Sequence, residues 1–367
     1  MKIAWFASSL VSSYWNGAAT YYRGLVRALA ERGHEITFYE PDAYERQQHR
    51  DVADPPWAEV VVWQPTEAEA RRLIRGARAA DVVVKASGVG VLDDVLAQCV
   101  ASLDGPVRVF WDVDAPATLA AADAAFASLA ASFDLVLTYG GGAPVVERYL
   151  DLGARECVPV YNALDPQTHH PVAPDERFAG DLGFLGNRLP DREARVDELF
   201  LRAASLAPDR LFTLGGAGWE GKPLPPNVRL LGHVGTGDHN AFNCSSLAVL
   251  NVTRQSMAAN GWSPPTRVFE AAGAGACLIT DAWDGVELFL EPGVEVLVAQ
   301  DGHDVASHVL ALSQDVARRV GAAARERVLR EHTYARRAEQ VESVLGARVP
   351  TQAPAAARQT GPERMRA

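Results

Sequence analysis

Short runs of apolar residues alternate along the chain with longer segments in which apolar residues recur at helical spacing. Residues 2–7 form the first run, and Tyr21, Leu25 and Leu29 then mark one face of a helix predicted over 20–32. A glycine stop signal and a second apolar run follow this helix. The pattern predicts a strand–loop–helix–strand unit at the start of the chain.

The same alternation continues through the first half of the chain. The strands predicted after the first are 35–39, 59–63, 82–85, 107–111, 135–138 and 158–160, and the later helices are 67–79, 91–102, 117–132 and 145–151. Strands that alternate with helices indicate a mostly parallel sheet covered on both faces. We therefore expect a doubly wound α/β domain, with its functional loops after the carboxyl ends of the strands.

A turn-rich stretch over 159–174 separates this series from a second one and is a candidate hinge. The second series comprises strands at 181–185, 211–214, 228–231, 247–251, 277–280 and 295–298, then helices at 305–330 and 334–345. We predict an N-terminal domain over 1–163 and a second α/β domain over 164–330. The Pro-, Ala- and Arg-rich tail over 348–367 has little to bury and is expected to be disordered.

Composition narrows the class of protein. The chain has 367 residues, of which 48% are hydrophobic and 22% charged, as in globular proteins of two domains. Its net charge of −11 argues against nucleic acid or an anionic membrane as the main partner. The start of the chain lacks the pattern of a signal peptide, and no apolar run reaches the ~20 residues of a membrane span. Four cysteines without metal-ligand spacing indicate reduced thiols and a cytoplasmic protein.

The segment GWSPPTRVFEAAGAG (261–275) carries the strongest chemical signal. Pro264 and Pro265 mark the first turn of a helix, whose free N–H groups and partial positive charge suit a phosphate. Arg267 in that turn adds a bidentate donor, and Glu270 one turn later is placed to accept two hydroxyl groups, for example of a ribose. The alternative is that these residues only begin and solvate a surface helix.

Polar and glycine residues also follow the predicted strands of the first domain. Asp112 and Asp114 end one strand, where a carboxylate binds an acceptor hydroxyl or acts as a base, although Asp114 is equally placed to cap the next helix. Asn16 and Gly17 either bring a helix N-terminus to the reacting centre or form a plain turn. The glycines at 140–142 allow a ligand to approach the backbone or serve as a tight connection.

These motifs resemble those of the GT-B glycosyltransferases, and within them the spore-maturation CgeB-like group, which is similar to glycosyltransferase family 4. The segments that carry the resemblance are DLGFLGNRLPDR (181–192), the stretch from NVRLLGHV to LAVLNVTR (227–254), 261–275, the hinge YNALDP (161–166) and HTYARRAEQV (332–341). The resemblance implies two Rossmann-like domains that face each other across a cleft. It also implies a closing helix over 331–347 that packs back on the N-terminal domain.

By the same resemblance, the second domain binds a nucleoside-diphosphate sugar, a UDP- or TDP-sugar, as co-substrate, without a metal and without a permanently bound cofactor. Glu270 would bind the ribose. The diphosphate candidates are Arg188, Arg192 and Arg267, the nucleobase candidates are Gly232, His233 and Val234, and the remaining donor-binding candidates are Asn16, Gly17, Asn187, Arg254, Ser263, Pro265 and Thr266. The alternatives are ion pairs of Arg188 and Arg192 with nearby carboxylates, and a surface role for His233. Trp262 stands where family 4 enzymes carry a glutamate.

The predicted reaction is transfer of a sugar to a small-molecule, glycan or protein acceptor held by the first domain. The residues assigned to catalysis are Asp112, Asp114, Arg188 and Arg267. Similarity to family 4 favours retention of configuration, whereas an inverting enzyme would need one of the two aspartates as a base. A nucleotide-sugar epimerase and a degenerate nucleotide-sugar-binding protein are the alternatives. An NAD-dependent oxidoreductase is disfavoured, because no GxGxxG follows the first strand.

Overall fold

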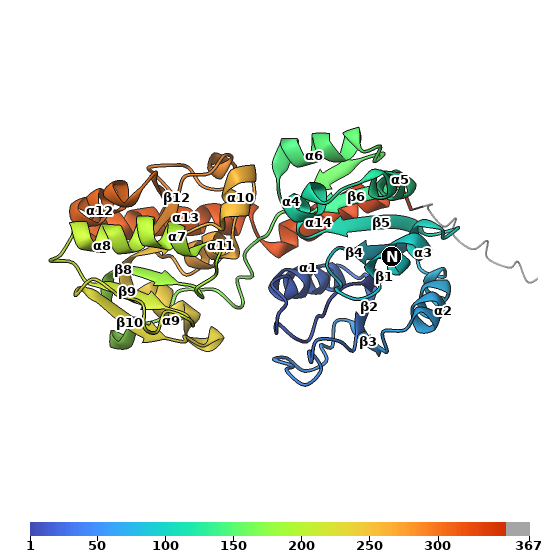
Figure 1. The fold of residues 1–367 in the computed structure, drawn as a ribbon, viewed down its shortest axis with the longest axis horizontal. Helices are drawn as coiled ribbons and strands as arrows, with labels where there is room; N and C mark the ends of the chain where they lie inside the picture. Colours follow the sequence, from blue (N-terminus) through green and yellow to red (C-terminus); the bar gives the residue numbers. More distant parts are fainter. Residues whose placement is uncertain (350–367) are drawn as a thin grey trace, which may run out of the picture.

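Two parallel β-sheets, each flanked by helices, form two lobes in the computed structural model, which describes residues 1–349 (Figure 1). The strand order is β3-β2-β1-β4-β5-β6-β7 in the N-terminal lobe and β10-β9-β8-β11-β12-β13 in the C-terminal lobe. Counted from the first strand of each lobe, the two orders are the same up to the sixth strand. In both, the order reverses beside the first strand, which is where such sheets bind ligands.

The strands follow the predicted series closely. Those of the N-terminal lobe are β1 (Lys2–Phe6), β2 (Glu35–Pro41), β3 (Glu59–Trp63), β4 (Val82–Ala86), β5 (Val107–Asp112), β6 (Leu135–Thr138) and β7 (Cys157–Pro159). Those of the C-terminal lobe are β8 (Gly180–Leu185), β9 (Phe212–Gly215), β10 (Val228–Gly232), β11 (Ser246–Asn251), β12 (Leu278–Asp281) and β13 (Leu297–Ala299). All neighbouring pairs are parallel, so the predicted doubly wound arrangement is confirmed.

The helices alternate with these strands. The N-terminal lobe contains α1 (Ala19–Glu31), α2 (Glu67–Ala77), α3 (Asp93–Ala101), α4 (Ala115–Ala120), α5 (Ala124–Ser132) and α6 (Gly142–Asp151). The later helices are α7 (Glu193–Val196), α8 (Arg202–Leu206), α9 (His239–Ser245), α10 (Gln255–Asn260), α11 (Thr266–Gly273), α12 (Gly302–Ala311), α13 (Gln314–Glu331) and α14 (Tyr334–Gly346). Short turns of other helical types are η1 (Glu176–Phe178), η2 (Asp197–Leu201), η3 (Thr236–Asp238) and η4 (Val286–Leu288).

Two helices predicted as single are each divided in the structure, so those two predictions are wrong. The stretch 117–132 divides into α4 and α5, because the side chain of Asp123 accepts a hydrogen bond from Phe126 N and caps a new helix. The stretch 305–330 divides into α12 and α13, where Ser313 accepts from Val316 N in the same way. The short helices α7 to α10 were not predicted.

Aromatic residues fill the N-terminal core between the sheet and α1. Trp5 on β1 and Trp111 on β5 are fully buried, with ring centroids 4.7 Å apart. The indole of Trp111 donates to the hydroxyl of Tyr21, which donates to the carbonyl of Val160. The polar atoms of Trp111 and Tyr21 are therefore satisfied inside the core, which fixes α1 over the sheet.

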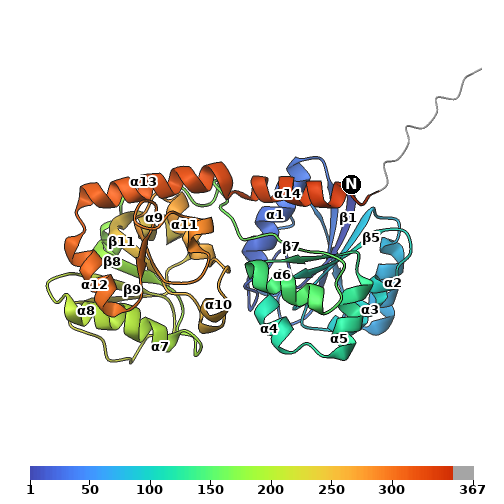
Figure 2. The same cartoon turned by 90° about the horizontal axis from the view of Figure 1, so that it is seen from above.

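The chain returns from the C-terminal lobe to the N-terminal lobe through α14. Figure 2 shows α13 lying along one lobe and α14 along the other. Tyr334 packs on Gly24 of α1, where a Cβ atom would lie 2.2 Å from the ring, and its hydroxyl donates to Asn162 at 2.6 Å. The outgoing and returning segments pair through a parallel bridge between Leu164 and Thr333.

Two further sequence predictions concern the C-terminal tail and membrane-spanning segments. From residue 350 onward, the tail predicted over 348–367 lies outside the described residues. Among residues 1–349, no helix has both the length and the apolar character that crossing a bilayer requires.

Candidate functional site

A cavity of about 220 Å³ lies between the two lobes, at the carboxyl ends of β8 and β11. Its lining from the N-terminal lobe is Gly17 and Tyr139, and from the C-terminal lobe Phe184, Leu185, Gly186, Arg192, Leu250, Asn251, Val252, Arg254, Met257, Pro265, Thr266 and Arg267. The strands β8 and β11 are the neighbours at which the strand order of the C-terminal sheet reverses. The cavity therefore occupies the ligand-binding crevice of a doubly wound sheet.

Two guanidinium groups in this cavity form no ion pair with any residue among 1–349. Nη1 of Arg267 is buried and has no hydrogen-bond partner, and Nε of Arg192 is in the same state. Nη2 of Arg192 donates only to the carbonyl of Asn187, at 2.6 Å. Burial, together with the neighbouring charge of Arg267, lowers the pKa of Arg192 to about 10. Unpaired, desolvated positive charge is costly, so this cavity strongly favours an anion.

The start of α11 adds to the positive potential of the cavity. Pro265 is the N-cap residue, and Thr266 and Arg267 form the first turn, as the sequence predicted. The first turn of a helix leaves N–H groups without intrahelical partners and carries a partial positive charge. Pro265, Thr266 and Arg267 all line the cavity, so the helix end and the guanidinium face the same space.

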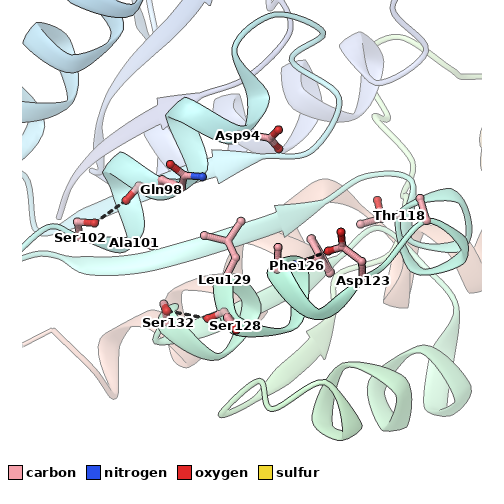
Figure 3. A pocket seen from close by; sticks show the side chains of 12 residues that line it. Asp94, Gln98, Ala101, Ser102, Thr118, Asp123, Phe126, Ser128, Leu129 and Ser132 are labelled. Carbon is pink, nitrogen blue, oxygen red and sulfur yellow. Dashed lines mark hydrogen bonds between the residues drawn. The ribbon is translucent and has the colours of Figure 1, made fainter.

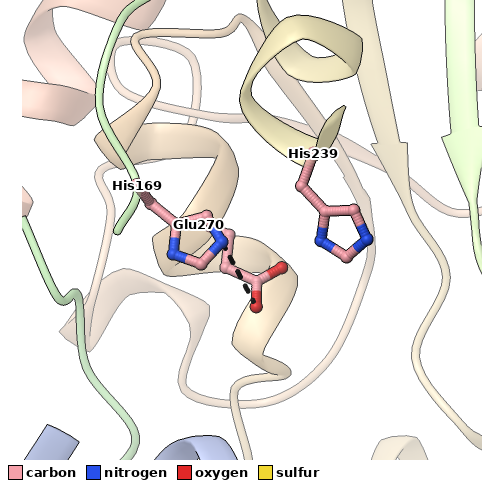
Figure 4. Close-up of side chains that lie close together, drawn as sticks. All are labelled: His169, His239 and Glu270. Carbon is pink, nitrogen blue, oxygen red and sulfur yellow. Dashed lines mark ion pairs between the residues drawn. The ribbon is translucent and has the colours of Figure 1, made fainter. Parts of the chain in front are cut away.

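Glu270 lies one helical turn beyond Arg267, with a histidine on either side (Figure 4). Nε2 of His169, from the interlobe segment, is 3.9 Å from Oε1 of Glu270, and His239 comes from the start of α9. Burial and then the charge of Arg267 lower the pKa of His239. The carboxylate also raises the pKa of Tyr139, a residue of the N-terminal lobe, beyond the effect of burial.

His169, His239 and Glu270 are residue types that bind transition metals. Their nearest ligand atoms all lie within 4.8 Å of one another. Bonds of about 2.1 Å to a tetrahedral zinc ion would bring donor atoms to about 3.4 Å from one another. The described arrangement is wider than that, and the nearby charge of Arg267 opposes a cation. Its open carboxylate is better suited to hydroxyl groups.

The two aspartates at the end of β5 differ sharply. The carboxylate of Asp112 is fully buried and accepts hydrogen bonds from Ser87, Thr118 and Tyr149 and from the backbone N–H of Asp114. These bonds occupy its oxygens and anchor the turn between β5 and α4, an arrangement that does not favour Asp112 as a base.

Asp114 has a different environment. It occupies the N-cap position of α4, but its side chain makes no capping hydrogen bond and remains open to solvent. Partial desolvation and the negative charge of Asp112 raise the pKa of Asp114, whereas Arg254 from the opposite lobe lowers it. Asp114 is thus the accessible carboxylate of the pair and faces the C-terminal lobe.

Several predicted site residues lie outside the cavity. Arg188 pairs with Glu193 at 2.7 Å, so the ion-pair alternative holds for it. The amide of Asn16 is buried and bonded to Ser8, Ser9 and Ser12, which leaves only the neighbouring Gly17 at the cavity. The other predicted residues outside the lining are Asp112, Asp114, Asn187, Gly232, His233, Val234, Ser263 and Glu270.

Trp262 makes an interlobe contact that sequence reasoning missed. Its carbonyl accepts a hydrogen bond from Gly141 N at 2.7 Å, across the gap between the lobes. Its indole lies between Gly142 and Gly285, where added Cβ atoms would come within 2.6 Å and 2.2 Å of the ring. Trp262 adopts φ +42°, a conformation rare for a bulky residue. The runs of glycine in the sequence were the available signal for this close approach.

A larger hollow of about 650 Å³ lies elsewhere on the N-terminal lobe, between α3 and α5 (Figure 3). Its serines donate to carbonyls of their own helices: Ser102 to Gln98 and Ser132 to Ser128. The charged residues of its lining, Asp94 and Asp123, are both acidic, so the hollow offers no cation to an anionic ligand. Size alone therefore does not identify the functional site.

Comparison with known proteins gives a match for the C-terminal lobe. Residues 192–343 match the family described as glycosyl transferase-like. No curated protein matches the chain.

Solved structures resemble the whole described chain. Sucrose-phosphate synthase from Thermosynechococcus elongatus has a TM-score of 0.70 at 13% identity, covering 95% of this chain and 98% of that one. HepE from Anabaena, solved with UDP and glucose, has a TM-score of 0.66 at 14% identity, covering 95% of this chain and 100% of that one. BGT of phage T4, solved with its UDP-glucose substrate, has a TM-score of 0.62 at 12% identity, covering 95% of this chain and 99% of that one. At these identities the likeness shows the fold, and the predicted GT-B fold is confirmed.

Proposed function

We propose that this GT-B protein is a glycosyltransferase that moves a sugar from a nucleoside-diphosphate sugar to an acceptor on the N-terminal lobe. The observation that carries the proposal is the pair of desolvated, unpaired guanidiniums of Arg192 and Arg267 in the interlobe cavity. A diphosphate supplies the negative charge that these groups lack. The match of residues 192–343 to the glycosyl transferase-like family supports the same conclusion.

The arginines have a direct role in the proposed reaction. When the bond between the anomeric carbon and the diphosphate oxygen breaks, negative charge grows on the leaving phosphate. Arg192, Arg267 and the N-terminus of α11 stabilise that charge in a site with little water, where fixed donors act most strongly. The two guanidiniums provide the charge that a divalent cation would otherwise provide, so the proposed reaction is metal-independent.

The remaining parts of the donor extend along the C-terminal lobe. Glu270 accepts hydrogen bonds from the ribose hydroxyls, and His169 beside it restricts the orientation of the carboxylate. The nucleobase, of UDP or TDP, lies toward the end of β10, near Gly232 and Val234. In this proposal residues 164–330 form the donor domain and residues 1–163 the acceptor domain, with 331–347 as the returning helix.

The proposed stereochemical course is retention of configuration. Asp112 is fully occupied by hydrogen bonds, and no strong base is required when the departing phosphate itself accepts the acceptor's proton. Asp114, opposite Arg254, then orients the acceptor hydroxyl rather than removing its proton. The CgeB-like grouping remains a prediction.

A ligand screen followed by a turnover assay tests this function. Thermal unfolding of the full chain is measured with UDP, TDP and GDP and with their glucose conjugates, because a ligand raises apparent stability in proportion to its affinity. We expect UDP or TDP to raise the melting temperature and the matching nucleotide sugar to release free nucleotide only when an acceptor is present. Isomerisation of the sugar without acceptor, followed by NMR, would identify an epimerase instead. Absence of binding by every nucleotide would overturn the proposal.

A further inference from the structure

The rim of the N-terminal lobe presents aromatic rings to solvent. Trp15, in the loop after β1, is 81% exposed, and Tyr14 beside it is 37% exposed. Tyr44, in the loop after β2, is 52% exposed. Because β1 and β2 are neighbouring parallel strands, both loops lie at the same edge of the sheet. Large exposed rings gathered at a functional edge indicate a binding surface.

The backbone at these rings is strained. Trp15 has φ +48° and Tyr44 has φ +56°, values that cost energy for residues with bulky side chains. Among residues 1–349, the non-glycine residues with positive φ are Trp15, Tyr44, Glu45, Leu92 and Trp262. The first four lie in the loops that follow β1, β2 and β4, and Trp262 lies between α10 and α11. Strain held in such loops is typical of binding and catalytic sites rather than of plain connections.

Contacts within the loops hold these rings in place. Asp51 accepts hydrogen bonds from the backbone and hydroxyl of Ser13 and from both terminal nitrogens of Arg23. Tyr14 stacks on His49, with ring centroids 4.0 Å apart and an angle of 11° between the planes. The exposed ring of Trp15 therefore projects from a braced loop.

A cation ties the two loops together. Arg46 donates to the carbonyl of Trp15 at 3.3 Å and lies over the ring of Tyr44, 5.0 Å from its centroid. The hydroxyl of Tyr44 donates in turn to the carbonyl of Gly90, in the loop after β4. Three rim loops thus present one surface in which aromatic rings alternate with charged and polar groups.

The loop that carries Trp15 also reaches the interlobe cavity. Gly17 lines the cavity and is two residues from Trp15, a length of chain that spans at most about 7 Å. A molecule on the ring of Trp15 is therefore within reach of the position where a donor sugar would enter. This proximity bears on the acceptor, because the acceptor must present a hydroxyl at that position.

We propose that Trp15, with Tyr14 and Tyr44, forms an acceptor subsite for a saccharide, so that the acceptor of the proposed transferase is a glycan. The C–H face of a pyranose ring is apolar and covers an aromatic ring, while its hydroxyls point sideways to hydrogen-bonding groups. His49, of which only Nδ1 is bonded within the loop, and the exposed carboxylate of Glu45 supply such groups. A wholly apolar acceptor would desolvate them without compensation. This inference rests on the proposed function and names its acceptor class.

The test uses the full chain on a glycan array in the presence of UDP, with wild type compared with Trp15→Ala, Trp15→Gly and Trp15→Phe. We expect wild type to bind a subset of neutral glycans. The Ala and Gly variants should lose at least tenfold in affinity, and the Phe variant should keep part of it. UDP binding, measured by calorimetry, should stay unchanged in all three. Leu288→Ala, which removes a side chain 49% exposed on the opposite lobe, is the matched control and should bind as wild type does.

The glycine variant separates a binding role from a structural one. Glycine tolerates a positive φ, so Trp15→Gly should keep or raise the melting temperature while glycan binding is lost. A marked fall in melting temperature would make Trp15 a structural residue and overturn the proposal. Failure of wild type to bind any glycan, or Trp15-dependent binding of p-nitrophenol or of neutral lipid vesicles instead, would also overturn it. Because UDP binding is measured separately, failure of the proposed function is distinguishable from failure of this subsite.

Discussion

The two lobes share a strand order and differ in the chemistry of their rims. In the N-terminal lobe, Asp112 and Asn16 at the rim are hydrogen-bonded within the lobe, and the rim exposes aromatic rings. In the C-terminal lobe the rim leaves Arg192 and Arg267 without an ion-pair partner among residues 1–349. We therefore propose that a common scaffold carries two unlike binding surfaces, one for a saccharide and one for an anion. The loops, rather than the fold, decide what each lobe binds.

The largest expected effect comes from removing the unpaired charge. Arg267→Ala should weaken UDP binding roughly 100-fold or more, since truncating one partner of a buried charged pair costs about 2–5 kcal/mol. In the absence of nucleotide the same variant should be as stable as wild type or more so, because the buried charge has no partner to lose. Calorimetry and thermal unfolding measure the two quantities.

Arg188→Ala is the matched control, because Arg188 is neutralised by Glu193 outside the cavity. It should change UDP affinity less than threefold. Equal losses in the two variants would mean that general surface charge, rather than the cavity, binds the nucleotide.

A substitution that forces open the contact between the lobes at Trp262 should give the next largest effect on activity. In Gly142→Ala, the new methyl group would lie 2.6 Å from the indole of Trp262, so the interlobe contact must open. We expect kcat/KM to fall about tenfold, as small misplacements of reacting groups do, and small-angle scattering to show a larger radius of gyration.

Gly293→Ala provides the comparison. Gly293 also has positive φ (+81°) but no atom within 4 Å of an added Cβ. It pays the same backbone strain, about 1–2 kcal/mol, without touching the interlobe gap. If both variants lose activity equally, the loss comes from strain and not from opening of the contact.

Substitution of Asp114 tests the proposed stereochemistry and should have a smaller effect on kcat. Asp114→Asn should lower kcat less than tenfold, because retention needs no strong base, and NMR of the product should show the anomeric configuration of the donor. If Asp114 acts as a base in an inverting enzyme, kcat should instead fall about 100-fold or more. Inverted product together with such a loss would contradict the proposed course.

The last prediction concerns the stability of the junction between the lobes rather than nucleotide binding or catalysis. Burial, with the nearby charge of Arg337, lowers the pKa of His332 to about 3. The unfolded chain therefore binds this proton more readily, and stability falls as the pH drops below about 6.5, by about 1.4 kcal/mol per unit. His332→Gln should flatten that slope between pH 6 and 4 in urea unfolding. An unchanged slope would assign the acid sensitivity to other groups.

Sequence patterns were sufficient for the strands and for the start of α11, whose first turn lines the proposed anion site. Apolar runs of parallel strands are read easily because both faces are buried. Proline at a helix start and an arginine in the first turn are local signals, so Pro265 and Arg267 were found without the fold. The divided helices were missed although Asp123 and Ser313 are ordinary capping residues, because alanine-rich periodicity on both sides outweighed them.

Long-range pairing could not be read from the sequence. Whether Arg188 or Arg192 stays unpaired depends on where Glu193 and Asn187 lie in space, and both arginines occur in one turn. Asp112 and Asp114 likewise differ only in which neighbours reach them. The contact of Trp262 with Gly142 joins residues from opposite lobes, and no local pattern predicts such a pair.

The two passages of the chain between the lobes restrict how the molecule can move. They run side by side through the Leu164–Thr333 bridge, and Tyr334 fastens the second passage onto Gly24. Two paired connecting segments are expected to let the lobes open by rotation about the connection and to resist twisting about the long axis. After each release of product the lobes would therefore close again in the same relative orientation. The aromatic residues of the N-terminal rim would then face the arginines of the C-terminal lobe as before.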